Sequence, residues 1–214
     1  MAEPLRILAM ASGGGRTILN LHERISSGHL RGVTLTDIFV SHAECLAAQR
    51  CRDVGLQVHL PEDDLEASVR QCFDALNPDM VLLCGYLRHV HIPESLHQRV
   101  MNIHPALLPD FGGPGMYGDH VHAAVLASGN QASGCTVHLV DDVFDHGPVV
   151  LQHECPVAPD DDVSSLAARV FAMECEAMPQ AVALAADGRL RLTDGAIDIA
   201  PSGECWPEAL FSRR

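Results

Sequence analysis

Short apolar runs alternate with amphipathic segments along the first half of the chain. Runs of about four to eight apolar residues predict buried strands, whereas apolar residues that recur every three or four positions predict helices. The expected strands span residues 5–10, 33–40, 56–60 and 79–84, and the expected helices span residues 16–25, 43–54 and 62–76. Because strands that alternate with helices form parallel sheets, we predict an α/β fold with a mostly parallel central sheet and helices on both faces.

The second half of the chain continues this pattern but contains longer polar and glycine-rich segments. Strands are expected over residues 100–104, 135–140, 149–153 and 188–193, and helices over residues 120–127 and from the acidic residues 160–162 to about 186. The segment from residue 195 has no clear period. Since neither an internal repeat nor a linker is present, we interpret residues 1–194 as one domain with halves at about 1–98 and 99–194, followed by a tail over residues 195–214.

The charge of the chain restricts its partners. The 214 residues carry a formal net charge of −14, and all 14 basic residues are arginines. A broad basic surface for nucleic acid is therefore not expected, and an anionic small molecule would need a local site built from backbone N–H groups and a few arginines. The absence of lysine excludes a P-loop lysine and a Schiff base, so the 13 histidines are the main candidates for proton chemistry near neutral pH.

The cysteines and histidines do not predict a metal site. None of the eight cysteines forms a C-x-x-C pair, and most lie in apolar runs, where a free thiol behaves as a small hydrophobic group. The pairs His89/His91 and His120/His122 could chelate, but no third ligand follows from their spacing. With no signal peptide and no apolar stretch of about 18 residues, we expect a cytoplasmic protein with reduced thiols and no membrane contact.

A glycine-rich turn joins the first expected strand to the first expected helix. Glycines at such a turn allow backbone N–H groups to approach an anion at the helix N-terminus. The turn is Gly13-Gly14-Gly15, followed by Arg16 and Thr17, which can both donate hydrogen bonds to a phosphate or carboxylate. A dinucleotide fingerprint is not matched, because Ile18 stands where its third glycine belongs. A tight turn without a ligand is the alternative interpretation.

Two further segments carry candidate chemistry. Asn102 and His104 lie two residues apart near a strand end, so both side chains point to the same face, where an amide and an imidazolium can stabilise an oxyanion. The acidic loop 141–148 is either solvated surface or the source of a carboxylate that folds back on His104 and raises its pKa.

The string Asn102-Ile103-His104-Pro105, the Leu-Leu-Pro after it, and Asp145-x-Gly147-Pro148 resemble motifs of the folate-dependent formyltransferases. The similarity covers about residues 5–193, and within the family it is strongest to the branch that formylates glycinamide ribonucleotide in purine synthesis. It implies a Rossmann-like formyltransferase fold with a nucleotide-binding first half and a catalytic, folate-binding second half. It also implies that 10-formyltetrahydrofolate, as co-substrate, and the ribonucleotide amine share one cleft without a metal.

The resemblance assigns roles to individual residues. The catalytic trio would be Asn102, His104 and Asp145. The ribonucleotide would be bound by Gly13, Gly14, Gly15, Arg16, Thr17, Pro105 and Glu174. The folate would be bound by Leu87, Arg88, His89, Val90, Met101, Val140, Asp141 and Asp142. Protonated His104 and Asn102 would donate to the oxyanion, while Asp145 keeps His104 charged.

The chain also departs from the family pattern around the phosphate. Gly15-Arg16-Thr17 stands where the family usually has Gly-Ser-Asn, Phe171 replaces a polar residue, and Glu62 replaces a basic one. We therefore expect Arg16 to supply phosphate charge. Alternatives are formyl transfer to a different amine, hydrolysis of 10-formyltetrahydrofolate and, from other classes, a non-catalytic folate- or nucleotide-binding module. A monomer and a homodimer are both compatible with the sequence.

Overall fold

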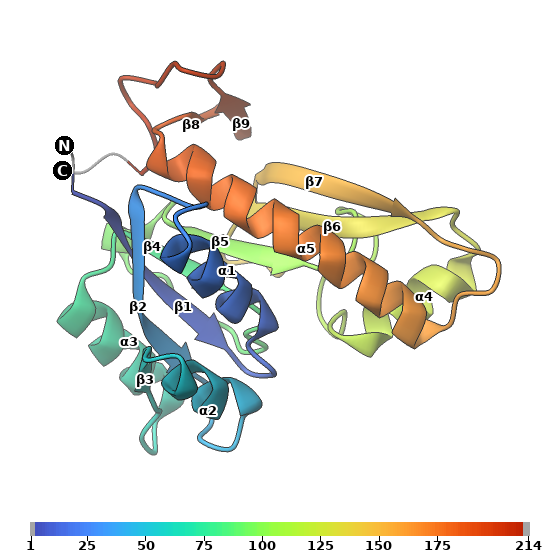
Figure 1. Cartoon of the computed structure of the whole chain (residues 1–214), viewed down its shortest axis with the longest axis horizontal. Coiled ribbons are helices and arrows are strands. Elements are labelled where there is room, and N and C mark those ends of the chain that lie inside the picture. Colours follow the sequence, from blue (N-terminus) through green and yellow to red (C-terminus); the bar gives the residue numbers. More distant parts are fainter. Residues whose placement is uncertain (1–2, 212–214) are drawn as a thin grey trace.

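The computed structural model describes residues 3–211, and its core is a seven-stranded sheet in the order β3-β2-β1-β4-β5-β6-β7 (Figure 1). The strands are β1 (Leu5–Ala11), β2 (Val33–Val40), β3 (Gln57–His59), β4 (Met80–Leu83), β5 (Val100–His104), β6 (Ala132–Leu139) and β7 (Val149–Pro156). β1 to β5 are mutually parallel, whereas β6 pairs antiparallel with β5 and β7 pairs antiparallel with β6. The predicted α/β fold with a mostly parallel sheet is confirmed.

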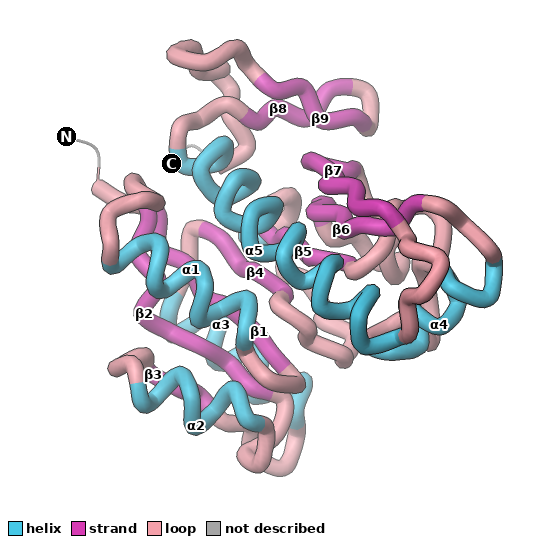
Figure 2. The backbone as a smooth tube through the Cα atoms, turned by 45° about the vertical axis from the view of Figure 1, so that its right-hand side comes forward, coloured by secondary structure: helices cyan, strands magenta, loops and turns pink. Residues whose placement is uncertain are grey.

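The apolar strands are buried on both sides because helices cover both faces of the sheet. Along β1, Ile7 and Ala9 belong to one core, whereas Leu8 and Met10 belong to the other. The first core also receives side chains of α1 (Arg16–Ser26), α2 (Leu46–Asp53), α4 (Asp119–Ser128) and α5 (Val163–Ala186). The second core receives side chains of α3 (Leu65–Leu76), which lies behind the sheet in Figure 2.

Capping residues explain where two helices begin. Asp64 accepts a hydrogen bond from the Ala67 backbone N–H, so α3 starts at Leu65 and not at residue 62 as the pattern predicted. Asp162 and Ser165 form a reciprocal capping box at the start of α5. The acidic run before α5 therefore supplies the cap, and the helix itself begins at Val163.

The expected boundary before residue 195 does not match the structure. β8 (Leu190–Thr193) pairs antiparallel with β9 (Ala196–Ile199), so the boundary falls in the turn of a hairpin. β9 was missed because its four residues do not alternate clearly between apolar and polar. Beyond it, Phe211 is only 2% exposed and belongs to the first core. The described part of the segment is therefore packed on the domain. Residues 1–2 and 212–214 lie outside the described residues.

Candidate active site

A cavity of about 520 Å³ lies at the carboxyl ends of β1, β4 and β5, where ligands of open α/β sheets bind. The glycine-rich turn after β1 and residues 85–90 after β4 line neighbouring parts of it, and β5 and the loop after β6 line the part beyond them, in the order of the strands in the sheet. Ser12 joins the first two parts, because its N–H donates to the Gly85 carbonyl and its hydroxyl accepts from the Leu87 N–H. Segments about 70 residues apart in sequence therefore form one wall.

The glycine turn is shaped by close packing. Gly15 has φ 68° and precedes α1, and a Cβ at this position would lie 2.9 Å from the Ala47 Cβ. Any side chain there would be strained and would push α2 away from the turn. Arg50 of α2 donates from Nη1 to the Gly14 carbonyl at 2.9 Å, which holds the turn from outside. The turn therefore presents its backbone to the cavity in one conformation.

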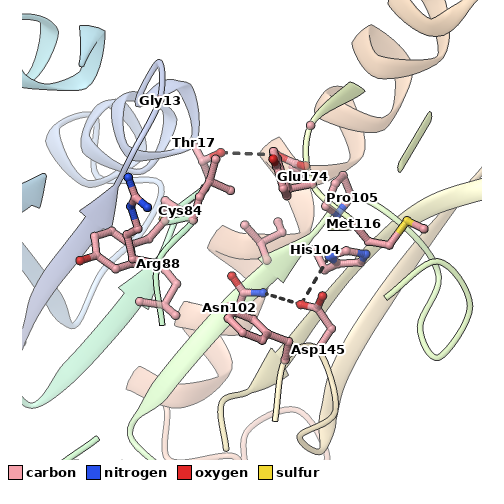
Figure 3. A pocket seen from close by; sticks show the side chains of 18 of the residues that line it. Gly13, Thr17, Cys84, Arg88, Asn102, His104, Pro105, Met116, Asp145 and Glu174 are labelled. Carbon is pink, nitrogen blue, oxygen red and sulfur yellow. Dashed lines mark hydrogen bonds and ion pairs between the residues drawn. The ribbon is translucent and has the colours of Figure 1, made fainter. Parts of the chain in front are cut away.

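A carboxyl group from α5 faces the first turn of α1. The Thr17 hydroxyl donates to Glu174 Oε2 at 3.4 Å, as the dashed line in Figure 3 shows. Burial raises the pKa of Glu174 to about 7, and the charge of Arg16 and the hydrogen bond from Thr17 only partly oppose this. Glu174 therefore titrates near neutral pH.

The three expected catalytic side chains come together at β5 and the loop after β6, beside this wall (Figure 3). Asp145 Oδ1 lies 3.3 Å from Asn102 Nδ2 and 3.5 Å from His104 Nδ1. Asp145 has φ 55°, a left-handed conformation that turns the loop after β6 back toward β5. Its second oxygen accepts from the Gly113 N–H at 2.9 Å, so two loops hold the carboxylate in place.

The protonation of His104 differs from the expectation. Burial lowers the pKa of His104, and this effect exceeds the opposing influences of Asp145 and the Phe111 carbonyl. His104 Nε2 lies 2.8 Å from the Phe111 carbonyl oxygen, which requires the proton on Nε2. The neutral ring therefore leaves a lone pair on Nδ1 beside Asp145. Asp145 raises the pKa of His104, as expected, but burial of the ring lowers it further.

His138 belongs to this cluster and was not predicted. It stands opposite Asn102 in the β5–β6 pairing, and its Nε2 lies 3.1 Å from Asn102 Nδ2. Its Nδ1 lies 2.8 Å from the Leu139 carbonyl oxygen, so Nδ1 carries the proton and Nε2 accepts from Asn102. Burial acts to raise the pKa of Asp145. The contacts with His138, His104 and Gly113 outweigh burial, so the pKa of Asp145 is lowered. The carboxylate is therefore ionised.

Most of the expected folate-contacting residues line the cavity, but two do not. Leu87, Arg88, His89, Val90, Val140 and Asp141 all face it. Met101 is fully buried in the first core, since its side chain points opposite to that of Asn102 along β5. Asp142 is exposed and does not line the cavity. The expected ribonucleotide-contacting residues, Pro105 included, all line it.

The structure adds three apolar side chains to Leu87, which was already expected at the site, and together they form an apolar rim. Leu87, Tyr117, Val143 and Phe144 line the cavity and are each about half exposed. The rings of Phe144 and His89 meet edge to face, with centroids 5.7 Å apart. Exposed apolar side chains at the mouth of a cavity are typical of a site that takes a flat or aromatic ligand. The apolar residues inside the acidic loop were the signal that could have indicated this rim.

The described residues also bear on a metal site, on the state of the cysteines and on membrane spans. No group of three or more histidine, cysteine or acidic side chains within residues 3–211 is arranged to hold a metal ion, and His120/His122 gain no third ligand there. All eight cysteines are free, and burial raises the pKa of Cys84, the one that lines the cavity. Among the helices that the structure describes, none is both long and apolar enough to cross a membrane.

Comparison with known proteins finds similarity over most of the chain. The formyl transferase family profile matches residues 5–182. A chloroplastic phosphoribosylglycinamide formyltransferase of Vigna unguiculata is 38% identical over 175 residues, which are 78% of this chain and 56% of the plant protein. The chain thus spans just over half the length of that relative. The phosphoribosylglycinamide formyltransferase of Escherichia coli (strain K12) is 31% identical over 201 residues, 90% of this chain and 92% of the bacterial protein.

The fold is matched by solved structures as well. The glycinamide ribonucleotide transformylase 1 of Symbiobacterium toebii superposes with a TM-score of 0.86 at 28% identity, covering 94% of this chain and 96% of that one. The match extends over nearly the whole described chain.

Proposed function

The chain belongs to the formyl transferase family, and from that premise we propose that it transfers the formyl group of 10-formyltetrahydrofolate to the amine of glycinamide ribonucleotide, a step of de novo purine synthesis. The relatives that carry the name phosphoribosylglycinamide formyltransferase support the choice of acceptor.

One observation in the structure carries the proposal. A single cavity contains the Gly13–Gly15 turn at the N-terminus of α1, an apolar rim at Leu87 and Phe144, and the Asn102–His104–Asp145 trio. A ribonucleotide needs the first, a folate ring needs the second, and formyl transfer needs the third. We assign the ribonucleotide to Gly13–Thr17, Pro105 and Glu174, and the folate to Leu87–Val90, Val140 and Asp141. We do not assign Met101 and Asp142 to the folate, because neither residue lines the cavity.

The geometry supports a proton-transfer route through His104. As the acceptor amine attacks the formyl carbon, the new C–N bond leaves a proton on the amine and negative charge on the formyl oxygen. Neutral His104 accepts that proton at Nδ1, and ionised Asp145, 3.5 Å away, stabilises the imidazolium. His104 then returns the proton to the departing folate nitrogen as its bond to the formyl carbon breaks. Formylated amine and tetrahydrofolate are the products.

Asn102 would stabilise the oxyanion only after a change of partner. Both of its amide hydrogens have acceptors in the structure, His138 Nε2 and Asp145 Oδ1. The contact to Asp145 is long at 3.3 Å, and protonation of His104 draws the carboxylate toward the imidazolium. One amide hydrogen is then free for the formyl oxygen, at the stage when negative charge develops on it.

We also propose that the enzyme works in the cytoplasm, as a monomer or homodimer. Its eight free cysteines, six of them buried, support a reducing compartment.

The test is a formyl-transfer assay with purified protein. We expect deformylated folate to form when 10-formyltetrahydrofolate and glycinamide ribonucleotide are both present, with one formylated ribonucleotide per folate. Release of formate at the same rate without the ribonucleotide would establish hydrolysis and overturn the proposal. Transfer only to other amines would overturn the choice of acceptor while keeping the formyl chemistry.

A further inference from the structure

We propose that Phe171 is a positioning residue that holds the Arg16 guanidinium as the anchor for the 5′-phosphate of the acceptor. This inference rests on the proposed function, because it concerns how the same cavity selects a phosphorylated amine. The two residues come from different helices, Arg16 from the start of α1 and Phe171 from α5. The sequence alone had marked Phe171 only as a lost polar contact.

The contact between the two side chains is well defined. The central carbon of the Arg16 guanidinium lies 4.0 Å from the centroid of the Phe171 ring. Both residues line the cavity, and α1 packs along α5 in both views of the chain (Figures 1 and 2). A cation over an aromatic face is attracted by the negative charge of the ring face. The ring therefore confines a side chain that would otherwise sample many rotamers.

The donors of Arg16 are left for a ligand. No hydrogen bond or ion pair joins Arg16 to any other residue in the described part of the chain, 3–211. The guanidinium carbon lies over the Phe171 ring, and the five N–H donors of the guanidinium radiate from its edge. Glu174, three residues after Phe171 on α5, is close enough for the Arg16 charge to influence its carboxyl group but not to form an ion pair. Arg16 is thus an exposed arginine without a carboxylate partner among these residues.

The surrounding charges favour a phosphate as the group that Arg16 binds. Arg16 directly follows the Gly13–Gly15 turn and lines the same cavity, and Arg50 of α2 donates to the Gly14 carbonyl of that turn. The chain contains no lysine and has a net charge of −14, so a dianion finds few cations elsewhere. A guanidinium can hold two phosphate oxygens through parallel hydrogen bonds, provided that its plane is oriented. The Phe171 ring supplies that orientation.

The experiment compares the acceptor with and without its 5′-phosphate. Steady-state formyl transfer is measured for the parent, Arg16→Ala, Phe171→Leu, Phe171→Tyr and the Arg16→Ala/Phe171→Leu double variant. Arg31→Ala removes an arginine that does not line the cavity and serves as the charge-matched control. Circular dichroism and the KM for 10-formyltetrahydrofolate verify that each variant is folded and binds the other substrate.

We expect Arg16→Ala to raise the KM for glycinamide ribonucleotide about ten- to a hundredfold, as for loss of a charge-assisted hydrogen bond. Phe171→Leu should raise it about two- to fivefold, Phe171→Tyr should leave it unchanged, and the double variant should match Arg16→Ala. The phosphate-free acceptor should react poorly but equally with all variants. Inorganic phosphate should compete with the ribonucleotide in the parent and only weakly in Arg16→Ala.

Different results would overturn the proposed function, the role of Arg16 and the role of Phe171. A parent that does not formylate the ribonucleotide overturns the proposed function. An active parent whose KM changes less than twofold in Arg16→Ala overturns the anchor. A raised KM in Arg16→Ala together with a parental KM in Phe171→Leu overturns the positioning role of Phe171. Equal effects on both acceptors show that these side chains support the fold and not the phosphate.

Discussion

In the polar cluster of the cavity, the hydrogen-bond partner of each histidine determines which ring nitrogen carries the proton. The cluster consists of Asn102, His104, His138 and Asp145. The Leu139 carbonyl sets the tautomer of His138, and the Phe111 carbonyl sets that of His104. Buried histidines remain neutral unless a partner stabilises the charge, and here a single carboxylate does not outweigh burial. In the mechanism proposed above, the resting site accepts a proton at His104 Nδ1, and the imidazolium forms only during the reaction.

The first prediction concerns His104 itself. In the proposed mechanism His104 carries the proton from the amine to the leaving nitrogen, so His104→Ala should lower kcat about 10²- to 10⁴-fold. The dissociation constant for a 10-formylfolate analogue, measured by fluorescence titration, should change little. Loss of folate binding with a matching loss of thermal stability would instead identify His104 as a structural residue.

A second prediction follows from the raised pKa of Glu174, which moves from 4.5 to about 7 on folding. Between these values the folded chain binds a proton that the unfolded chain has released, so the free energy of unfolding decreases as pH rises from about 4.5 to 7. Glu174→Gln removes this penalty. The variant should match the parent near pH 4.5 and be more stable by about 1–3 kcal/mol above pH 7.

Urea unfolding at pH 5 and pH 8 measures the difference. Glu176→Gln, which removes an exposed carboxylate from the same helix, is the control and should show no such increase between the two pH values. A Glu174→Gln variant that is less stable than the parent at pH 8 would show that the carboxylate is stabilised by Arg16 and Thr17 more than burial disfavours it.

At the scale of elements, the turn between β6 and β7 decides where the carboxylate lies. Gly147 follows Asp145 by two residues, and a Cβ there would lie 1.9 Å from the Leu139 carbonyl oxygen. The obstacle is backbone, so it cannot rotate away. The acidic loop is therefore not only solvated surface: its close return past β6 brings Asp145 to β5.

The third prediction tests this turn. Gly147→Ala should displace the loop and lower kcat at least about tenfold, because a shift of about 1 Å misplaces the catalytic carboxylate. Gly13→Ala, where no atom lies within 4 Å of the added Cβ, is the control for thermal stability and should unfold at nearly the parental temperature. Parental kcat in Gly147→Ala would mean that the turn has room to adjust without moving Asp145.

At the scale of the whole molecule, residues after the sheet complete the hydrophobic core. The β8–β9 hairpin and the segment after it return to the domain, where Phe211 is buried among first-core residues. The domain and its expected tail are thus one packing unit within the described residues. Residues of α1 and α5 belong to the same core.

The fourth prediction measures that contribution. Phe211→Ala should lower the free energy of unfolding by about 3–5 kcal/mol, as expected for removing a buried aromatic ring. Ile199→Ala, at an exposed position of β9, should cost much less. Equal and small effects of both substitutions in urea unfolding would show that the segment contributes little to the core.

Local sequence determined the elements and the direction of some side chains. Apolar runs are sufficient to locate β1, β2, β4 and β5, because buried parallel strands need apolar residues on both faces. The two-residue spacing of Asn102 and His104 placed both on the cavity side by strand geometry alone. The same alternation turns Met101 into the core, against the expectation drawn from the family resemblance. The local sequence also predicted the glycine turn before α1 and the acidic start of α5, where Asp162 is the capping residue.

Only the tertiary structure decided which of these pieces meet. Asp145 reaches His104 across 41 residues through a turn that backbone packing confines, and Arg16 meets Phe171 across 155 residues through the contact of two helices. The lowered pKa of His104 and the raised pKa of Glu174 depend on how much water the assembled fold removes from each group. The local pattern of apolar and polar residues does not predict such contacts or such burial. Both depend on segments that become neighbours only when the sheet and its helices assemble around the cavity.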